Sequence, residues 1–193
     1  MNASIADCVA AARHKITVAE ARAMAAAEVF GDDVKFELID GELIFMPDDG
    51  GRTINWAAEI NRWLVSSLTA RPDLVIVPDK TLVLSDHNAP KPDYYVFPAS
   101  FADPEDVRGP DILIAIEVSD TTLKKDLGPK AALYAAWGVR DYWVIDCDAR
   151  ATLVHRLGPN GYETPVRVDA KDVVRALLIP ELALRLDDHP RLR

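Results

Sequence analysis

The chain has little cysteine and no long apolar run, and each lack excludes a class of protein. Cys8 and Cys147 are the two cysteines among 193 residues, and their spacing is not that of metal ligands. Neither a zinc knuckle nor a disulfide framework is indicated, and the pair suits a reducing cytoplasm. No apolar run approaches the roughly 20 residues of a membrane span, and the N-terminus lacks a signal-peptide pattern. We therefore expect a cytoplasmic protein without a membrane partner.

Positive charge is also scarce. Lysine and arginine total 22 against 31 acidic residues, so the formal net charge is -9. This balance argues against a surface that coats polyanions generally, but it permits a local cationic groove and a carboxylate site for a divalent metal. Hydrophobic residues at 49% and charged residues at 27% are ordinary for a globular chain. We expect one domain over residues 1–193, with an N-terminal helical arm (1–33) and a core (34–186).

The N-terminal part predicts a helix followed by a β-hairpin. Thr17 and Glu20 form a capping-box pattern before an alanine-rich segment that Gly31 is placed to end. Asp40-Gly41 is typical of a type I′ turn and predicts a hairpin over 34–46. Glu37 falls on a half-apolar face of that hairpin, where a solvated rim and a functional role are both open.

The middle and end of the chain predict an α/β sheet with a partly antiparallel edge. A helix is expected over 53–68, because apolar residues recur there at helical spacing. Strands are expected over 74–77, 81–84, 94–97, 112–116 and 142–145, and a later hairpin over 151–157 and 161–168.

Three residues around the central strands suggest chemistry. Glu117 ends the buried run 112–116, where a carboxylate is costly unless a cation, metal or ligand pairs with it. Asp93 opens a neighbouring strand, and Lys130 lies on the helix that follows. Two carboxylates on adjacent strands can hold Mg²⁺, and a lysine can orient a nucleophile or neutralise a phosphate. The trio alone is a weak pattern, since such residues are more often on the surface.

A wider set of motifs resembles the Uma2 family of bacterial endonucleases, formerly a domain of unknown function, within the PD-(D/E)XK nuclease superfamily. The matching motifs span residues 36–146 and are Phe36-Glu37-Leu38-Ile39-Asp40-Gly41-Glu42-Leu43, Lys91-Pro92-Asp93, Glu117-Val118-Ser119, Thr122, Asp126-x-x-x-Lys130-x-x-x-Tyr134, and Gly138-Val139-x-x-Tyr142-Trp143-Val144-Ile145-Asp146.

The resemblance implies a restriction-endonuclease-like core, with a mixed β-sheet flanked by helices and preceded by an N-terminal helix and hairpin. It implies that Asp93 and Glu117 bind Mg²⁺, for which Mn²⁺ can substitute, and that DNA is the substrate. The usual superfamily lysine, two positions after the glutamate, would fall at Ser119. In this family it has moved to the next helix, which matches Lys130.

Secondary site candidates are Glu37, Lys125, Asp126 and Tyr134. Each of the last three also has a structural interpretation. Lys125 could be a solvated loop lysine, and Asp126 could be a helix-start residue that accepts hydrogen bonds from backbone amides. Tyr134 could be a core residue with a tethered hydroxyl. Thr53 occupies a position where family members often carry histidine, and it cannot act as a base at neutral pH.

Two other functions stay open besides a nuclease. One is a nuclease fold retained as a binding or assembly module, often as a homodimer, which the missing histidine favours. The other is a metal-dependent hydrolase of a small phosphate ester, which a narrow closed pocket would favour.

Overall fold

The structure is a computed structural model that describes residues 14–31, 34–46, 50–189 and 191–192. The chain divides into two compact units. Unit 1 combines residues up to Pro47 with Val83–Pro90, and unit 2 combines Asp48–Leu82 with Lys91–Arg193. The expectation of a single domain stays a prediction. Among the described residues, no helix combines the length and the apolar character that crossing a membrane requires.

Unit 1 begins with helix α2 (Val18–Ala26), which has the predicted capping box. The Thr17 hydroxyl accepts from the Glu20 amide, and the Glu20 carboxylate accepts from the Thr17 amide at 2.8 Å. Hydrogen bonds to the Glu20 carboxylate from the Thr17 amide, which is the largest cause, and from the Thr17 hydroxyl and His14 lower the pKa of Glu20 to about 2. The helix ends before the expected stop at Gly31, because the chain turns at Glu28, which has a φ of 55°.

The hairpin of unit 1 has the predicted register. Strands β1 (Phe36–Ile39) and β2 (Glu42–Phe45) are antiparallel, with Phe36 opposite Phe45 and Leu38 opposite Leu43. Asp40 and Gly41 both have positive φ, 50° and 75°, as a type I′ turn requires.

The strand expected over 81–84 is not formed. Instead, the Leu84 amide donates to the Asn88 carbonyl, and Ser85 bridges to Asn88 in a tight local loop. The chain then pairs Ala89 with Leu38 of the hairpin. The apolar residues of segment 81–84 therefore lead into a loop and do not form a strand of a sheet.

Unit 2 is built on a mixed seven-stranded sheet with the order β3-β4-β5-β6-β7-β8, with β9 also paired to β7. The pair β5–β6 is parallel, and the other neighbours are antiparallel. The strands are β3 (Leu74–Pro78), β4 (Tyr94–Pro98), β5 (Ile114–Ser119), β6 (Asp141–Asp146), β7 (Ala151–Gly158), β8 (Gly161–Tyr162) and β9 (Val166–Asp169).

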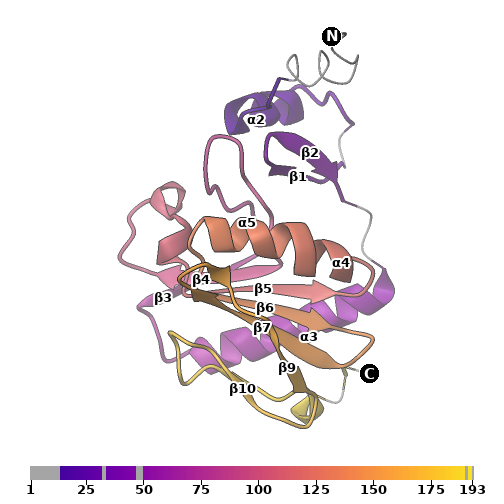
Figure 1. The fold of residues 1–193 in the computed structure, drawn as a ribbon, viewed down its shortest axis with the longest axis vertical. Coiled ribbons are helices and arrows are strands. Elements are labelled where there is room, and N and C mark those ends of the chain that lie inside the picture. The colour runs from indigo at the N-terminus through magenta and orange to yellow at the C-terminus, as the bar shows by residue number, and fades with distance from the viewer. Residues whose placement is uncertain (1–13, 32–33, 47–49, 190, 193) are drawn as a thin grey trace, which may run out of the picture. The chain divides into compact units, whose positions relative to one another are not determined.

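Helices cover the sheet of unit 2 on both faces (Figure 1). One face carries α3 (Gly51–Leu68), whose predicted apolar stripe of Trp56, Ile60, Trp63, Leu64 and Leu68 is buried. The other carries a helical segment in three parts: α4 (Leu123–Lys125), a π-helical turn η3 (Asp126–Lys130) and α5 (Ala131–Ala136). Alternate residues of β5 therefore face different helices.

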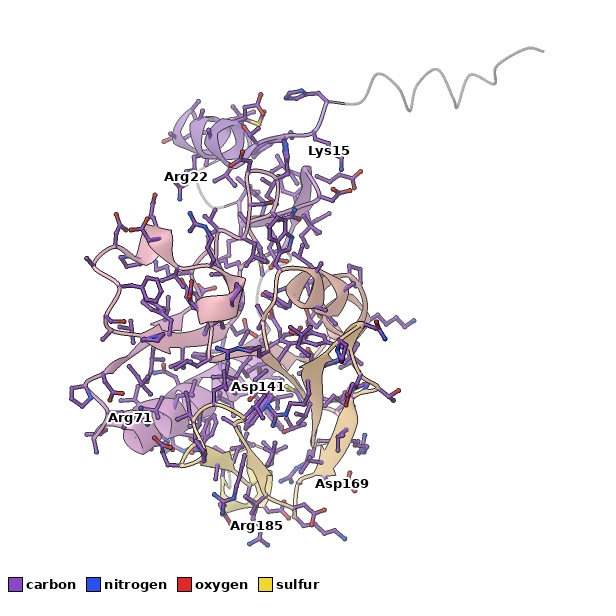
Figure 2. All side chains as sticks on the ribbon, turned by 60° about the vertical axis from the view of Figure 1, so that its left-hand side comes forward. Lys15, Arg22, Arg71, Asp141, Asp169 and Arg185 are labelled. Atoms are coloured by element: carbon purple, nitrogen blue, oxygen red, sulfur yellow. The ribbon has the colours of Figure 1, made fainter. Side chains whose placement is uncertain are left out.

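Short elements complete unit 2. They are η1 (Pro104–Asp106), η2 (Gly109–Asp111), β10 (Val174–Arg175), β11 (Ala183–Leu184) and η4 (Leu186–Asp188). Charged side chains such as Arg71, Asp169 and Arg185 extend at the surface, whereas Asp141 lies in the interior (Figure 2). Asp141 is paired there with Arg156 and accepts from the Leu177 amide at 2.7 Å.

Candidate active site

Glu117 is the carboxylate around which the site is built. It is the fourth of six residues in β5, not the last, and only 4% of its surface is exposed. The Lys130 ammonium lies 2.6 Å from Glu117 Oε1, and the Tyr134 hydroxyl donates to the same oxygen at 3.3 Å. A carboxylate in this position is stable because charged and polar partners replace its water.

Lys130 reaches Glu117 from the helical segment that covers the β5 face. The lysine is 1% exposed, and its Nζ also donates to the Lys91 carbonyl at 3.3 Å. Lys91 in turn pairs its own ammonium with Asp79 Oδ1 at 2.6 Å. The ammonium predicted to act at this site is therefore held between β5 and the residues that lead into β4.

Asp93 lies immediately before β4, beside Glu117. Its Oδ2 accepts from the Val118 amide at 2.6 Å. The β4–β5 register pairs Tyr94 with Ile116, so one further step places Asp93 opposite Glu117. Residues opposite one another in an antiparallel pair share a face, with Cβ atoms about 4.5–5.5 Å apart. The structure thus brings all three sequence-predicted residues to one place, Lys130 and Glu117 by direct contact and Asp93 by register.

Asp126 and Tyr134 also lie on this face. Asp126 is 2% exposed, and its Oδ2 accepts from the Ser119 hydroxyl at 2.7 Å and the Thr122 hydroxyl at 2.6 Å. It therefore binds hydroxyls rather than the backbone amides of a helix start. Tyr134 has a tethered hydroxyl, but the tether is Glu117 itself.

Two residues that contact Asp126 had no role assigned from the sequence. Ser119 was treated there as the vacated lysine position, yet its hydroxyl holds Asp126. Tyr142 of β6 donates to the Asp126 carbonyl at 3.0 Å, and its ring lies 4.8 Å from that of Tyr134. Burial raises the pKa of Tyr142 well above its ordinary value, and the nearby Glu117 carboxylate adds to the effect. The tyrosine therefore stays protonated and donates its hydrogen bond. Proline inside a helical segment, at Pro129, was the available indication of an irregular turn here.

The roles of the remaining candidates stay predictions. Lys124 is exposed and Lys125 is half-buried. Glu37 belongs to β1 of unit 1 and is 1% exposed, so the interpretation as a solvated rim is wrong. Thr53 is at the start of α3, next to Arg52, whose guanidinium binds Asp120 and Asp148. The histidine position is thus at the edge of the sheet where β5 and β6 end.

The donor chemistry of the pair Asp93 and Glu117 fits Mg²⁺. Mg²⁺ prefers oxygen ligands and is commonly bound by one or two carboxylates, with waters and substrate phosphates in the other positions. Among the residues that the structure describes, no cluster of three or more His, Cys, Asp and Glu side chains is arranged for a metal. A two-carboxylate site that is completed by water and substrate is consistent with both observations.

A separate cavity of about 610 Å³ lies between α5 and the β7–β8 hairpin. Alanines of α5 form much of its wall, together with His155, Tyr162 and Glu163, and none of the lining residues is Lys or Arg. A phosphate ester needs cationic or metal partners, so this cavity gives no support to the hydrolysis of a small phosphate ester.

The mixed sheet, the flanking helices and the face that carries Asp93, Glu117 and Lys130 define the chain as restriction-endonuclease-like. A solved protein from Anabaena variabilis ATCC 29413, described as a putative nuclease belonging to DUF820, has the same fold. The match has a TM-score of 0.67 and 19% sequence identity, and it covers 82% of this chain and 91% of that one. No curated protein matches.

The family model described as Uma2, "Putative restriction endonuclease", matches residues 18–187. The chain belongs to the Uma2 family, as the sequence motifs predicted.

Proposed function

We propose that the chain is a Mg²⁺-dependent endonuclease that hydrolyses phosphodiester bonds in DNA. Asp93 and Glu117 hold the metal, Lys130 assists, and Mn²⁺ can substitute for Mg²⁺. The observation that carries the proposal is the buried contact of 2.6 Å between Lys130 and Glu117, beside Asp93 in register. Family membership supports it, because the family model carries the description "Putative restriction endonuclease".

Each residue of the candidate site has a definite task in this proposal. The Val118 amide orients the Asp93 carboxylate, and Tyr134 and Lys130 orient Glu117. A metal held by Asp93 and Glu117 would polarise the phosphodiester and lower the pKa of a bound water. The Lys130 ammonium stabilises negative charge that develops on the phosphate, in a place from which water is largely excluded.

A plasmid-nicking assay with purified protein tests the proposal. Wild type should nick supercoiled DNA with Mg²⁺ or Mn²⁺ and should stop when the metal is chelated. Asp93→Asn and Glu117→Gln should abolish nicking, because each removes one anionic ligand with little change in volume. The matched control is Glu163→Gln, a carboxylate of the β7–β8 hairpin region that lines the separate cavity.

Nicking that survives equally in Asp93→Asn and Glu117→Gln would point to a contaminating nuclease and refute the assignment. A wild type that binds Mn²⁺ and DNA without cleaving it would instead favour the non-catalytic binding module. The Lys130–Glu117 pair would then serve only to neutralise two buried charges.

A further inference from the structure

The helical segment that brings Lys130 to Glu117 is attached to β5 at two points. Glu117 and Ser119 are two residues apart, so their side chains share one face of the strand. Lys130 contacts Glu117, and Asp126, four residues earlier, contacts Ser119. Both contacts are shielded from water, with Ser119 1% exposed and Asp126 2% exposed.

The second attachment is reinforced from two further directions. Thr122, just before α4, donates to the same Asp126 oxygen that Ser119 binds. Tyr142, from the neighbouring parallel strand β6, donates to the Asp126 backbone carbonyl. Asp126 is therefore held by three hydroxyl groups from three different segments of unit 2.

The turn between Asp126 and Lys130 needs such anchoring. It is π-helical and contains Pro129. Proline has no N–H and cannot donate to the carbonyl four residues earlier, so the helical ladder is interrupted between the two attachment points. Because Pro129 removes one backbone donor from this irregular turn, side-chain contacts carry a larger share of its positioning than in a regular helix.

We propose that Ser119, Thr122, Asp126 and Tyr142 are positioning residues that determine where the Lys130 ammonium lies against Glu117. The effect of this positioning on catalysis rests on the proposed nuclease function. Loss of the Ser119–Asp126 hydrogen bond lets the π-helical turn shift, and Lys130 moves away from the carboxylate. Misplacement by about 1 Å can cost roughly 10²-fold in rate, so the effect falls on the chemical step.

The test compares Ser119→Ala, Asp126→Ala and Asp126→Asn, with Ser66→Ala as the matched control. Ser66 is a serine of α3 whose hydroxyl donates to the Trp63 carbonyl at 3.0 Å, away from the site. Asparagine keeps one oxygen that can accept from both hydroxyls, so Asp126→Asn is the conservative variant. Two readouts are needed: kcat and KM for plasmid nicking, and the acetylation rate of Lys130 by mass spectrometry, with exposed Lys124 as internal reference.

Ser119→Ala and Asp126→Ala should lower kcat by roughly 10²-fold while KM changes by less than about twofold. Asp126→Asn should recover most of the rate. Lys130 should be acetylated faster in both alanine variants than in wild type. The Ser119→Ala/Asp126→Ala double variant should be no worse than Asp126→Ala alone, because Asp126→Ala already removes the Ser119–Asp126 hydrogen bond that Ser119→Ala removes.

The two proposals fail in different ways. Active wild type with folded alanine variants that keep the wild-type kcat and the wild-type Lys130 acetylation overturns the positioning proposal alone. The same holds if Asp126→Asn falls as low as Asp126→Ala. If wild type does not cleave DNA, the nuclease proposal fails, and acetylation of Lys130 decides the positioning proposal by itself. If the alanine variants do not fold, Tyr142→Phe, which removes a single hydroxyl, is judged by the same two readouts.

Discussion

Strand β5 has two buried faces with different chemistry. Ile114, Ile116 and Val118 point into an apolar core with α3. Glu117 and Ser119 point to the helical segment that carries Asp126 and Lys130. These five residues of β5 are all 0–4% exposed, so burial does not distinguish the two faces.

The two faces differ in what stabilises them. Apolar side chains gain free energy from removal from water, in proportion to area and with little directionality. Buried charges and hydroxyls lose hydration and are stable only if specific partners are in place. The stability of the β5 face that packs on α3 should therefore depend on side-chain volume. The β5 face toward α5 should instead be sensitive to the loss of a single atom or charge.

The largest expected effect is on stability, at the α3 face. Trp143 is fully buried and stacks on Trp63 at a ring distance of 6.3 Å. Trp143→Ala should lower the free energy of unfolding by about 3–5 kcal/mol, measured by urea denaturation, through lost contacts and a cavity. Nicking activity per folded molecule should change far less. Val65→Ala, at an exposed position on α3, is the control and should stay within about 0.5 kcal/mol.

The next largest effect is expected at Lys130, on the charged face of β5. Under the proposed function, Lys130→Ala should lower the nicking rate by roughly 10²-fold or more, since it would remove the electrostatic contact to the reacting phosphate. Lys124→Ala and Lys125→Ala should mainly weaken DNA binding, with an effect that fades as salt rises. Full activity in Lys130→Ala together with an inactive Lys125→Ala would show that the wrong lysine has been assigned.

Metal binding gives a third test, which needs no substrate. A ligand that binds only the native state stabilises it by about 2.7 kcal/mol at a hundredfold excess over its dissociation constant. Thermal melts with Mn²⁺ should show this gain for wild type, and Asp93→Asn and Glu117→Gln should lose most of it. Equal shifts in all three proteins would mean that the ion binds elsewhere on the acidic surface.

The smallest expected effect is a pH dependence from the α5 side of the sheet. His155 lies opposite Tyr142 in the β6–β7 pair, and burial lowers its pKa below the ordinary value of 6.5. Since the folded state disfavours the charged form, the stability from this group is present above pH 6.5. It is lost as the pH falls through the lowered pKa. His155→Phe should flatten this acid-side loss in urea titrations at a series of pH values, whereas an unchanged profile would assign the loss to other groups.

Local patterns in the sequence predicted much of the fold. The Asp40-Gly41 turn fixed the hairpin register, and the apolar spacing of Trp56, Ile60 and Leu64 gave the buried face of α3. Both depend on contacts between residues close in sequence. The strand expected at 81–84 did not form, because strand formation depends on a partner from a distant part of the chain, which composition does not reveal.

In the candidate site, the sequence suggested the residues but not most of the contacts between them. Asp93, Glu117 and Lys130 were identified from motifs, and the sheet register explains why they meet. The Ser119–Asp126 contact joins residues seven apart through the geometry of an irregular turn. Hydroxyl–carboxylate contacts of this kind leave no periodic pattern, so they become visible only in three dimensions.

The discontinuity of unit 1 has a consequence for synthesis on the ribosome. The hairpin bridges to Ala89, and the Asp40 amide donates to the Asn88 side chain at 2.8 Å. Between the hairpin and these partners the ribosome must synthesise all of α3 and β3, which belong to unit 2. Unit 1 therefore cannot close first, although most of it is translated first. A fragment that stops before residue 83 would expose the β1 positions that Ala89 normally pairs, and such an unpaired strand edge favours aggregation of nascent chains.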